Sequence, residues 1–245
     1  MNMLASLASD SSIANETDSV GGGSAPLESG LYGLSVSMAY ITKSKGGAMG
    51  LVITLAGQDK REVRQTLWMT SGTDKGCKNY YEKDGEKHFL PGFNHANALC
   101  LLTVGKEISG MDTEQKVIKL YNPEAKAEVP TKVDVLTELI GKEILVGLLK
   151  QTVDKTKKND AGVYEATGET RDENEIDKLF RASDRMTTAE IRAQATEAAF
   201  ADTWEAKWTG KTRNKAKGVS ANSGTFGAPK ATAAATKKPD NSLFA

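Results

Sequence analysis

The sequence predicts a mainly β fold with helices, an α+β chain built around an OB-like small barrel, and three observations support this. Apolar residues alternate with small or polar ones in several short segments. Two short helical patterns lie among these segments, and glycine- and lysine-rich connections separate them. Such a meander favours a closed or nearly closed barrel over repeated strand–helix–strand units.

Composition divides the chain into four parts. Residues 27–185 are expected to form the OB-like domain, since the segment before them, 1–26, is rich in Ser, Ala, Asp and Gly and is predicted to be disordered. Residues 186–210 predict an amphipathic helix. Residues 211–245 predict a basic disordered tail, with seven basic residues against Asp240 in a chain of zero net charge.

The first strands are the clearest. Residues 31–41 alternate with a period of two, and residues 51–57 resume the pattern after a basic, glycine-rich connection, which predicts a hairpin. A third strand covers 62–70. If its aliphatic side faces the core, Arg64 and Trp68 stand together on the outer face.

The later elements follow from helical spacing, capping residues and apolar runs. Residue Asn94 is the expected cap of the first helix, Gly105 its end, and Pro130 lies near the start of the second. The predicted order is a helix at 94–105, a strand at 114–122, a helix at 130–141, a central strand at 142–153, a lysine-rich loop at 154–160, and a final strand or short helix within 162–183.

The segment 68–93 places five aromatic residues and four lysines in a polar, glycine-containing loop. Every base has a π-face, so exposed rings can stack on an unpaired strand while lysine and arginine neutralise its phosphates. The alternative is that a given ring simply packs in the core, with Leu90 and Phe93 as anchors of the loop. The residues predicted to bind nucleic acid are Lys43, Lys45, Arg64, Trp68, Lys75, Lys78, Tyr80, Tyr81, Lys87, Phe89, Lys150, Lys155, Lys157 and Lys158.

Patterns that would indicate an enzyme are missing. The Gly-Lys-Thr at 210–212 lacks the upstream glycine of a phosphate-binding loop, because Glu205 stands there. The acidic run 172–177 has Ile176 where a calcium loop needs an oxygen ligand. With two histidines no Ser/His/Asp set is indicated, and no paired carboxylates indicate a two-metal nuclease. The sequence therefore predicts a non-catalytic protein that needs no cofactor.

Zinc is considered because all cysteines and histidines fall within one short stretch, and four such ligands can close a tetrahedral site. Their separations lack the tight pairs typical of zinc sites, and "ALCLL" reads as a buried hydrophobic segment. No metal is predicted. The weak candidate ligands are Cys77, His88, His95 and Cys100.

The helix that starts at the capping box Thr187–Glu190 carries an aromatic stripe at successive i+4 steps: Phe200, Trp204 and Trp208. Such a stripe is buried against its own domain or against a second subunit in a homo-oligomer. The alternative function is accordingly a scaffold or adaptor that binds a protein partner through residues 187–209.

The compartment is predicted from the chain's start and its cysteines. Two cysteines form no disulfide framework, and the first residues lack the basic and apolar regions of a signal peptide. No apolar run approaches the length of a membrane span. We expect a cytoplasmic protein without membrane contact.

Four stretches resemble a family of bacteriophage single-stranded-DNA-binding proteins of OB-fold type: "SGLYGLSVSMAYITKSKGGAMGLVITL", "TSGTDKGCKNYYEKDGEKHFLPGFNHANALCLLTVGKEI", "VIKLYNPEAKAEVPTKVDVLTELIGKEILVGLLKQTVDK" and "TGETRDENEIDKLF". The resemblance covers roughly residues 29–183. It implies a protein of the host-cell cytoplasm that coats exposed single-stranded DNA during replication and recombination, without catalysis. Such proteins commonly end in an acidic tail with an aromatic tip that recruits replication partners. Here Phe244 keeps the tip, but the preceding stretch is basic.

Overall fold

The computed structural model describes residues 25–58, 61–122, 125–159 and 163–217. It is mainly β with helices, as predicted, and its sheet is antiparallel except for one short parallel pair. The strands and helices in chain order are β1 (Gly30–Lys43), β2 (Met49–Ala56), β3 (Glu62–Trp68), β4 (Tyr80–Lys83), β5 (Glu86–Phe89), α1 (Pro91–Thr103), β6 (Glu114–Asn122), β7 (Ala127–Val135), β8 (Glu143–Lys158), β9 (Tyr164–Phe180), α2 (Thr188–Arg192), α3 (Ala199–Trp208) and β10 (Thr212–Asn214).

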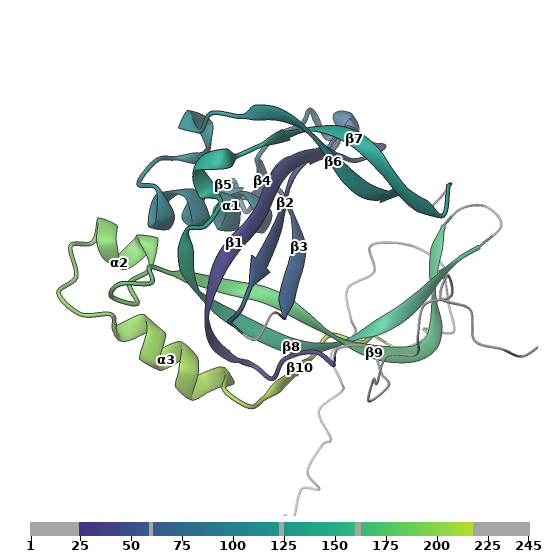
Figure 1. The fold of residues 1–245 in the computed structure, drawn as a ribbon. Helices are drawn as coiled ribbons and strands as arrows, with labels where there is room; N and C mark the ends of the chain where they lie inside the picture. Colours follow the sequence, from purple (N-terminus) through teal and green to yellow (C-terminus); the bar gives the residue numbers. More distant parts are fainter. Residues whose placement is uncertain (1–24, 59–60, 123–124, 160–162, 218–245) are drawn as a thin grey trace, which may run out of the picture.

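Strand β1 organises the sheet because it pairs along both edges. Its later part pairs with β2, which pairs with β3, and its first part pairs with β8, which pairs with β9. The hairpin of β6 and β7 joins β1 where Tyr40 meets Val135. Figure 1 shows α2 and α3 on one side of this sheet, while the β6–β7 and β8–β9 hairpins extend to the other.

The strand ladders do not close into a barrel in the described part of the chain. Strands β3 and β9 end the run of paired strands, and no ladder joins them there. Instead, the side-chain oxygen Oε1 of Gln65 accepts a hydrogen bond from the backbone N–H of Ile176 at 2.8 Å. These ladders therefore do not confirm the OB-like barrel, which was predicted to be closed or nearly closed.

The main core lies between the curved sheet and α1. It includes Leu51, Leu67, Leu99 and Ile144, none more than 2% exposed. A smaller cluster on the outer face joins the β6–β7 hairpin to β1 and β2. These two cores leave β3 at the edge of the sheet, next to α1.

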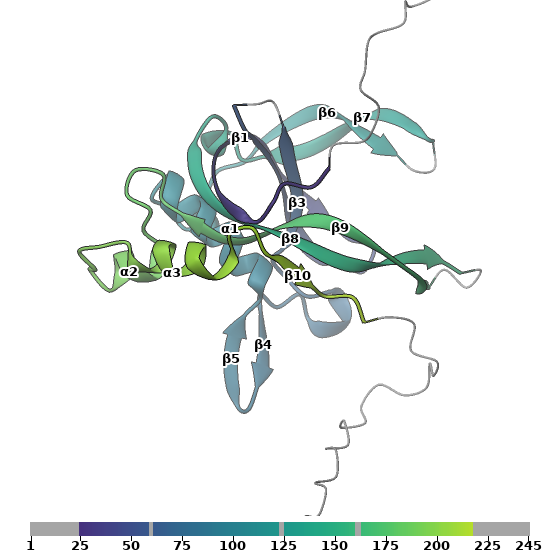
Figure 2. The same cartoon turned by 90° about the horizontal axis from the view of Figure 1, so that it is seen from below.

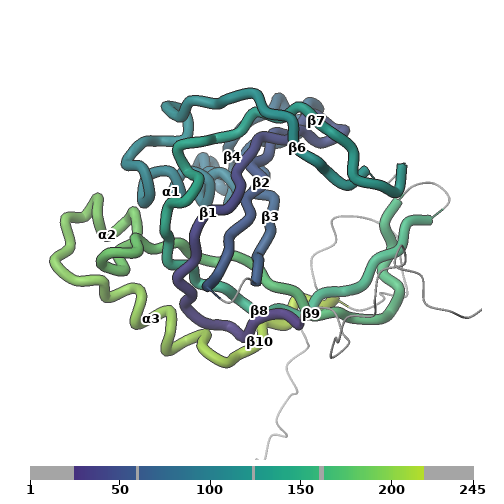
Figure 3. Tube along the Cα trace, in the orientation of Figure 1, coloured from purple at the N-terminus to yellow at the C-terminus, as the bar shows by residue number. Residues whose placement is uncertain are grey.

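Helix α3 is part of the same body. Trp204 packs with Leu149 and Phe180, and its ring lies so close to Gly147 that a Cβ there would meet it at 3.0 Å. Ser29 Oγ donates to the carbonyl of Lys211 at 2.5 Å. The start of β1 and the start of strand β10 therefore meet along β8, where β1 pairs with Glu143–Leu148 and β10 with Lys150–Thr152 (Figure 3).

The predicted second helix at 130–141 is wrong, because its first half is strand β7. Val129, Thr131, Val133 and Val135 alternate with polar residues, and the two latter valines are buried. β-Branched residues with a period of two suit a half-buried strand. Only the turn Thr137–Leu139 is helical, of the 3-10 type.

The predicted lysine-rich loop at 154–160 is also wrong for its described residues, because strand β8 continues to Lys158. Residues there pair with β9, for example Lys157 with Glu165. Opposite charges on facing strands favour this pairing. The final element, left open between a strand and a helix, is strand β9.

Three boundaries differ as well. Helix α1 starts at Pro91, not after Asn94, because proline suits the first helical position. The helix predicted over 187–209 is broken into α2 and α3, with Gln194 between them at a left-handed φ of 54°. The basic tail predicted from residue 211 begins inside the sheet, as strand β10.

None of the helices in the described segments is long and apolar enough to cross a membrane.

Candidate nucleic-acid interface

The segment 68–93 was predicted to be a loop, but much of it folds into the projecting hairpin of β4 and β5 (Figure 2). Asp84 and Gly85 form its turn with φ angles of 53° and 82°. An Asp-Gly pair with positive φ at both positions is typical of a type I′ turn. The hairpin sets Tyr80 opposite Phe89, so these rings stand on a defined scaffold.

A cavity of about 890 Å³ lies between β3, the following loop, β4 and the start of α1. We call it the Trp68 pocket. Five residues of the predicted nucleic-acid site line it, and they are Trp68, Lys75, Lys78, Tyr80 and Tyr81. The fold therefore brings these five predicted residues together around one cavity.

Trp68 combines a fixed backbone with an open ring. Trp68 is 43% exposed. Its ring lies over Gly50 on the neighbouring strand, and a Cβ added at Gly50 would lie 2.9 Å from Cε3 of the indole. Behind it, a Cβ at Gly92 would lie 2.2 Å from the carbonyl oxygen of Trp68. Helix α1 therefore packs directly on this part of β3, and rigid elements present the indole to the pocket.

Tyr80 lies beneath two ammonium groups. The Nζ of Lys78 is 5.5 Å from the centre of its ring, and the Nζ of Lys87 is 5.0 Å from it. Both distances allow a cation–π attraction. Tyr81, its neighbour on the hairpin, is 45% exposed. Rings and cations are thus adjacent here, as single-strand binding requires.

The lining of the Trp68 pocket is not basic overall. Asp74, Glu82 and Glu175 line it together with Lys75 and Lys78, so carboxylates outnumber ammonium groups. The sequence reading counted the lysines of the segment and did not weigh the acids between them. Stacking surfaces, more than charge, characterise this pocket.

The connection between β1 and β2 reaches the same region. The backbone N–H of Thr73 donates to the carbonyl of Gly46 at 2.8 Å, and Gly46 lines the Trp68 pocket. Lys43 and Lys45, close to it in the chain, are exposed. Arg64 is exposed on the outer face as predicted, but it donates to the hydroxyl of Tyr40 at 2.7 Å and lines a different, smaller cavity.

The lysines predicted on strand β8 do not join this site. Lys150 is paired with Glu28 at 2.7 Å, and Lys155 is paired with Glu169 at 2.9 Å. The interpretation of this stretch as a loop flanking the groove was wrong, because it is a long strand. The two remaining lysines line a separate cavity at the hairpin tip, and they are Lys157 and Lys158.

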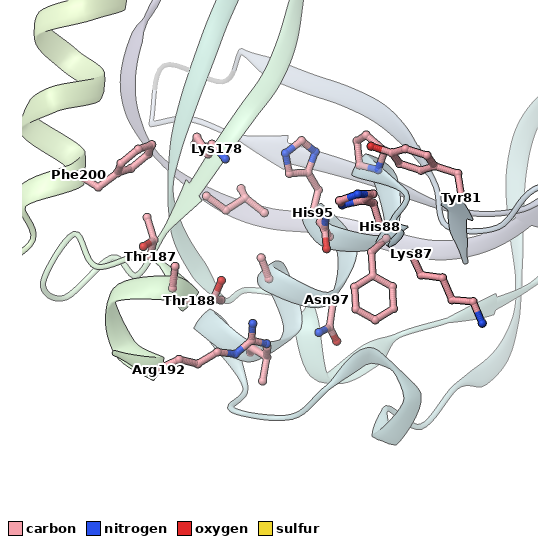
Figure 4. A pocket seen from close by; sticks show the side chains of 17 residues that line it. Tyr81, Lys87, His88, His95, Asn97, Lys178, Thr187, Thr188, Arg192 and Phe200 are labelled. Atoms are coloured by element: carbon pink, nitrogen blue, oxygen red, sulfur yellow. The ribbon is translucent and has the colours of Figure 1, made fainter. Parts of the chain in front are cut away.

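A second cavity, of about 690 Å³, lies between β5, α1, the end of β9, α2 and α3 (Figure 4). We call it the Lys178 pocket. Three residues of the predicted nucleic-acid site line it, and they are Tyr81, Lys87 and Phe89. Lys178 and Arg192 also line it, and the sequence reading missed them. They come from segments far apart in the chain, and no spacing connects them.

The aromatic stripe of α3 is directed mostly inward. Trp204 is 3% exposed and its Nε1 donates to Asp177 Oδ2 at 2.8 Å, so its assignment to a protein partner was wrong. Trp208 is partly buried against the same cluster. Phe200 is 39% exposed and lines the Lys178 pocket. Phe244 lies outside the described residues.

The weak metal candidates do not converge. In the described segments no three His, Cys, Asp or Glu residues are grouped to hold a metal ion. Cys100 is buried in the core as a small hydrophobic residue, and burial raises the pKa of its thiol to about 12. His95 is bonded through Nε2 to the carbonyl of Asp177 at 3.0 Å. Cys77 and His88 are exposed.

Comparison with known proteins assigns no family to this arrangement. No protein-family model matches the chain, and no curated protein matches it. The candidate site is therefore argued from its own geometry.

Proposed function

We propose that this protein binds single-stranded DNA through the Trp68 pocket, without sequence preference and without catalysis. The observation that carries the proposal is the convergence of Trp68, Tyr80 and Tyr81 on one cavity beside Lys75 and Lys78. Stacking on such rings tolerates any base, because every base offers a π-face. Coating and protecting exposed strands during phage DNA replication and recombination is the role that the family resemblance suggests.

The same proposal includes an OB-like fold. The order β3-β2-β1-β8-β9 gives five main strands, and α1 follows the third of them in the chain. A five-stranded barrel that is partly open is compatible with the OB pattern, whose surface and connecting loops bind oligonucleotides. The Trp68 pocket lies at the β3 edge of this sheet.

The alternative, a scaffold or adaptor acting through the 187–209 segment, is less favoured. Trp204 is buried in the protein's own core and Trp208 packs beside it. Of the stripe, Phe200 retains an exposed ring, and it faces a cavity lined by cations. A partner helix would have to compete with the sheet for the buried residues.

The test is a titration of fluorescently labelled oligo-dT, followed by anisotropy at low and moderate salt, with a duplex of equal length alongside. Replacing Trp68→Ala should weaken binding by about 1–3 kcal/mol if the indole stacks on a base. The control is Tyr121→Ala, which removes a ring that is 63% exposed on β6, away from the pocket.

Wild-type affinity should fall linearly with salt on logarithmic axes, because phosphate contacts release counterions. Duplex DNA should bind more weakly, because its bases are not free to stack on the rings. Equal losses of affinity in Trp68→Ala and Tyr121→Ala would contradict the proposal. Binding of the duplex as tight as that of oligo-dT would also contradict it.

A further inference from the structure

The wall of the Lys178 pocket carries cations and no carboxylate. Its 17 lining residues include Lys87, Lys178 and Arg192, and none is Asp or Glu. The whole chain holds as many acidic as basic residues, 32 of each. A wall without acids is therefore a local separation of charge, and it favours an anion.

Two of these cations are available to a ligand. Within the segments that the structure describes, neither Lys178 nor Arg192 forms an ion pair. The Nζ of Lys178 lies 5.7 Å from the centre of the Phe200 ring, which orients the ammonium without neutralising its charge. Lys87 is a weaker candidate, because Figure 4 shows its side chain directed away from Lys178 and Arg192, and its Nζ lies over the Tyr80 ring.

The pocket also offers faces for an aromatic ligand. Phe89 is 53% exposed and Phe200 is 39% exposed, and both line the cavity from opposite elements, β5 and α3. Its volume lies within the range of about 300–1,000 Å³ that small-ligand sites occupy. Rings together with unpaired cations suit a nucleotide better than a bare inorganic anion.

His95 adds a hydrogen-bond acceptor. A carbonyl oxygen only accepts, so the Nε2 that lies 3.0 Å from Asp177 O must carry the proton. Burial, the largest cause, and nearby Lys178 lower the pKa of His95, while Asp177 and Glu175 act in the opposite direction. The ring is therefore neutral near pH 7, and its Nδ1 has a lone pair that can accept a hydrogen bond from an N–H of a base, such as N3–H of thymine.

The two cavities are continuous in their lining. Tyr81, Pro91 and His95 line both the Trp68 pocket and the Lys178 pocket. A chain bound in one can thus pass over these residues into the other.

We propose that the Lys178 pocket seats a further nucleotide of the same single strand, with its phosphate between Lys178 and Arg192 and its base against Phe89 or Phe200. This assignment rests on the proposed binding of single-stranded DNA. It divides the work between the pockets, since the first supplies stacking surfaces and the second supplies charge for the phosphate.

The experiment compares oligo-dT binding over a range of salt concentrations for wild type, for Lys178→Gln/Arg192→Gln, and for the control Lys119→Gln/Lys132→Gln. The control removes two exposed cations from the β6–β7 hairpin. The salt slope is the slope of log affinity against log salt concentration. Loss of two phosphate contacts in Lys178→Gln/Arg192→Gln should reduce this slope by about 1.4. The affinity of the variant should then fall about sevenfold less than that of wild type between about 50 and about 200 mM salt.

The outcomes separate this inference from the proposed function. A reduced slope in the Lys178/Arg192 variant alone supports the inference. A slope equal to that of the control overturns it, although binding that still depends on Trp68 leaves the proposed function intact. If wild type fails to bind oligo-dT, both fail together.

One arm tests the source of the phosphate. Thymidine 5′-monophosphate, free in solution, is titrated into the same proteins. If it binds in a way that needs Lys178 and Arg192 while the salt slope for oligo-dT is unchanged, the pocket serves free nucleotides and the assignment to the strand is overturned. If it competes with oligo-dT and the slope also falls, the assignment is supported.

Discussion

The Trp68 pocket and the Lys178 pocket meet at Tyr81, yet they divide rings and charges differently. The Trp68 pocket has an indole fixed between β2 and α1, and its carboxylates outnumber its two lysines. The Lys178 pocket has cations, no carboxylate, and rings contributed by β5 and α3. Adjacent cavities of one surface can thus specialise in stacking and in neutralising phosphate.

Different hydrophobic clusters support the two pockets. The Trp68 pocket is built on β3 and α1, which belong to the main core. The Lys178 pocket depends in addition on α3, which is attached through a smaller cluster around Trp204. Damage to that cluster should therefore affect the second pocket more than the first.

The largest expected effect is that of Trp204→Ala. Deleting this buried ring removes its contacts with Phe180 and its hydrogen bond to Asp177, and should lower the free energy of unfolding by about 3–5 kcal/mol. Denaturant unfolding measures the change. Trp204→Phe, which keeps most of the volume, should lose less, and a loss below about 1 kcal/mol for Trp204→Ala would contradict the docking of α3.

The second prediction concerns the other pocket. In an open helix position, Gly→Ala stabilises by about 1 kcal/mol, but at Gly92 the added Cβ meets the backbone of Trp68. Gly92→Ala should instead destabilise by about 1–3 kcal/mol and weaken oligo-dT binding, since α1 must shift. Gly110→Ala, where nothing lies within 4 Å, is the matched control and should be nearly neutral in thermal unfolding.

A third prediction contrasts lysines by their partners. Lys75→Gln/Lys78→Gln should reduce the slope of log affinity against log salt for oligo-dT by less than about 1.4, an effect under about 1 kcal/mol over moderate salt, because Asp74, Glu82 and Glu175 share the lining with these lysines. Lys150→Gln/Lys155→Gln should leave the slope unchanged, because both ammonium groups are already paired with carboxylates. Equal slopes for the two double variants, from titrations at several salt concentrations, would show that the pocket lysines have no special role.

The smallest expected effect is a pH dependence of stability. The pKa of His95 is lowered from 6.5, first by burial and further by Lys178, against the influence of Asp177 and Glu175. The unfolded chain therefore binds this proton more readily, so the free energy of unfolding should be fully retained above pH 6.5 and fall as the pH drops below it. His95→Gln should show a shallower fall in urea titrations at about pH 7.5 and about pH 5.5. An equal fall in the free energy of unfolding with pH for His95→Gln and wild type would contradict this role of His95.

The sequence predicted the strands whose period was clear. Strands β1, β2 and β3 lie where alternation indicated them, because one side of each faces the core. The failures came where two patterns competed. In 130–141 the leucines and isoleucine suggested a helix, while the alternating valines and threonine belonged to a strand, and pairing with β6 and β1 decided between them.

The Trp68 pocket could be predicted because its residues lie close together in the chain. The Asp84-Gly85 pair was a signal for the hairpin that the sequence reading passed over. The Lys178 pocket could not be predicted, because β9, α2 and α3 bring its cations and Phe200 together through long-range packing. Lys178 in particular directly follows the acidic run 172–177, which gave no sign of a basic site.

Tryptophan fluorescence tests the central claim most directly, since Trp68 is the exposed indole and Trp204 is buried. Oligo-dT should quench the emission of wild type and of Trp208→Phe. The quenching should be lost in Trp68→Phe, provided that this variant unfolds like wild type. Quenching of equal size in Trp68→Phe and wild type would show that the indole of the Trp68 pocket does not meet the bases.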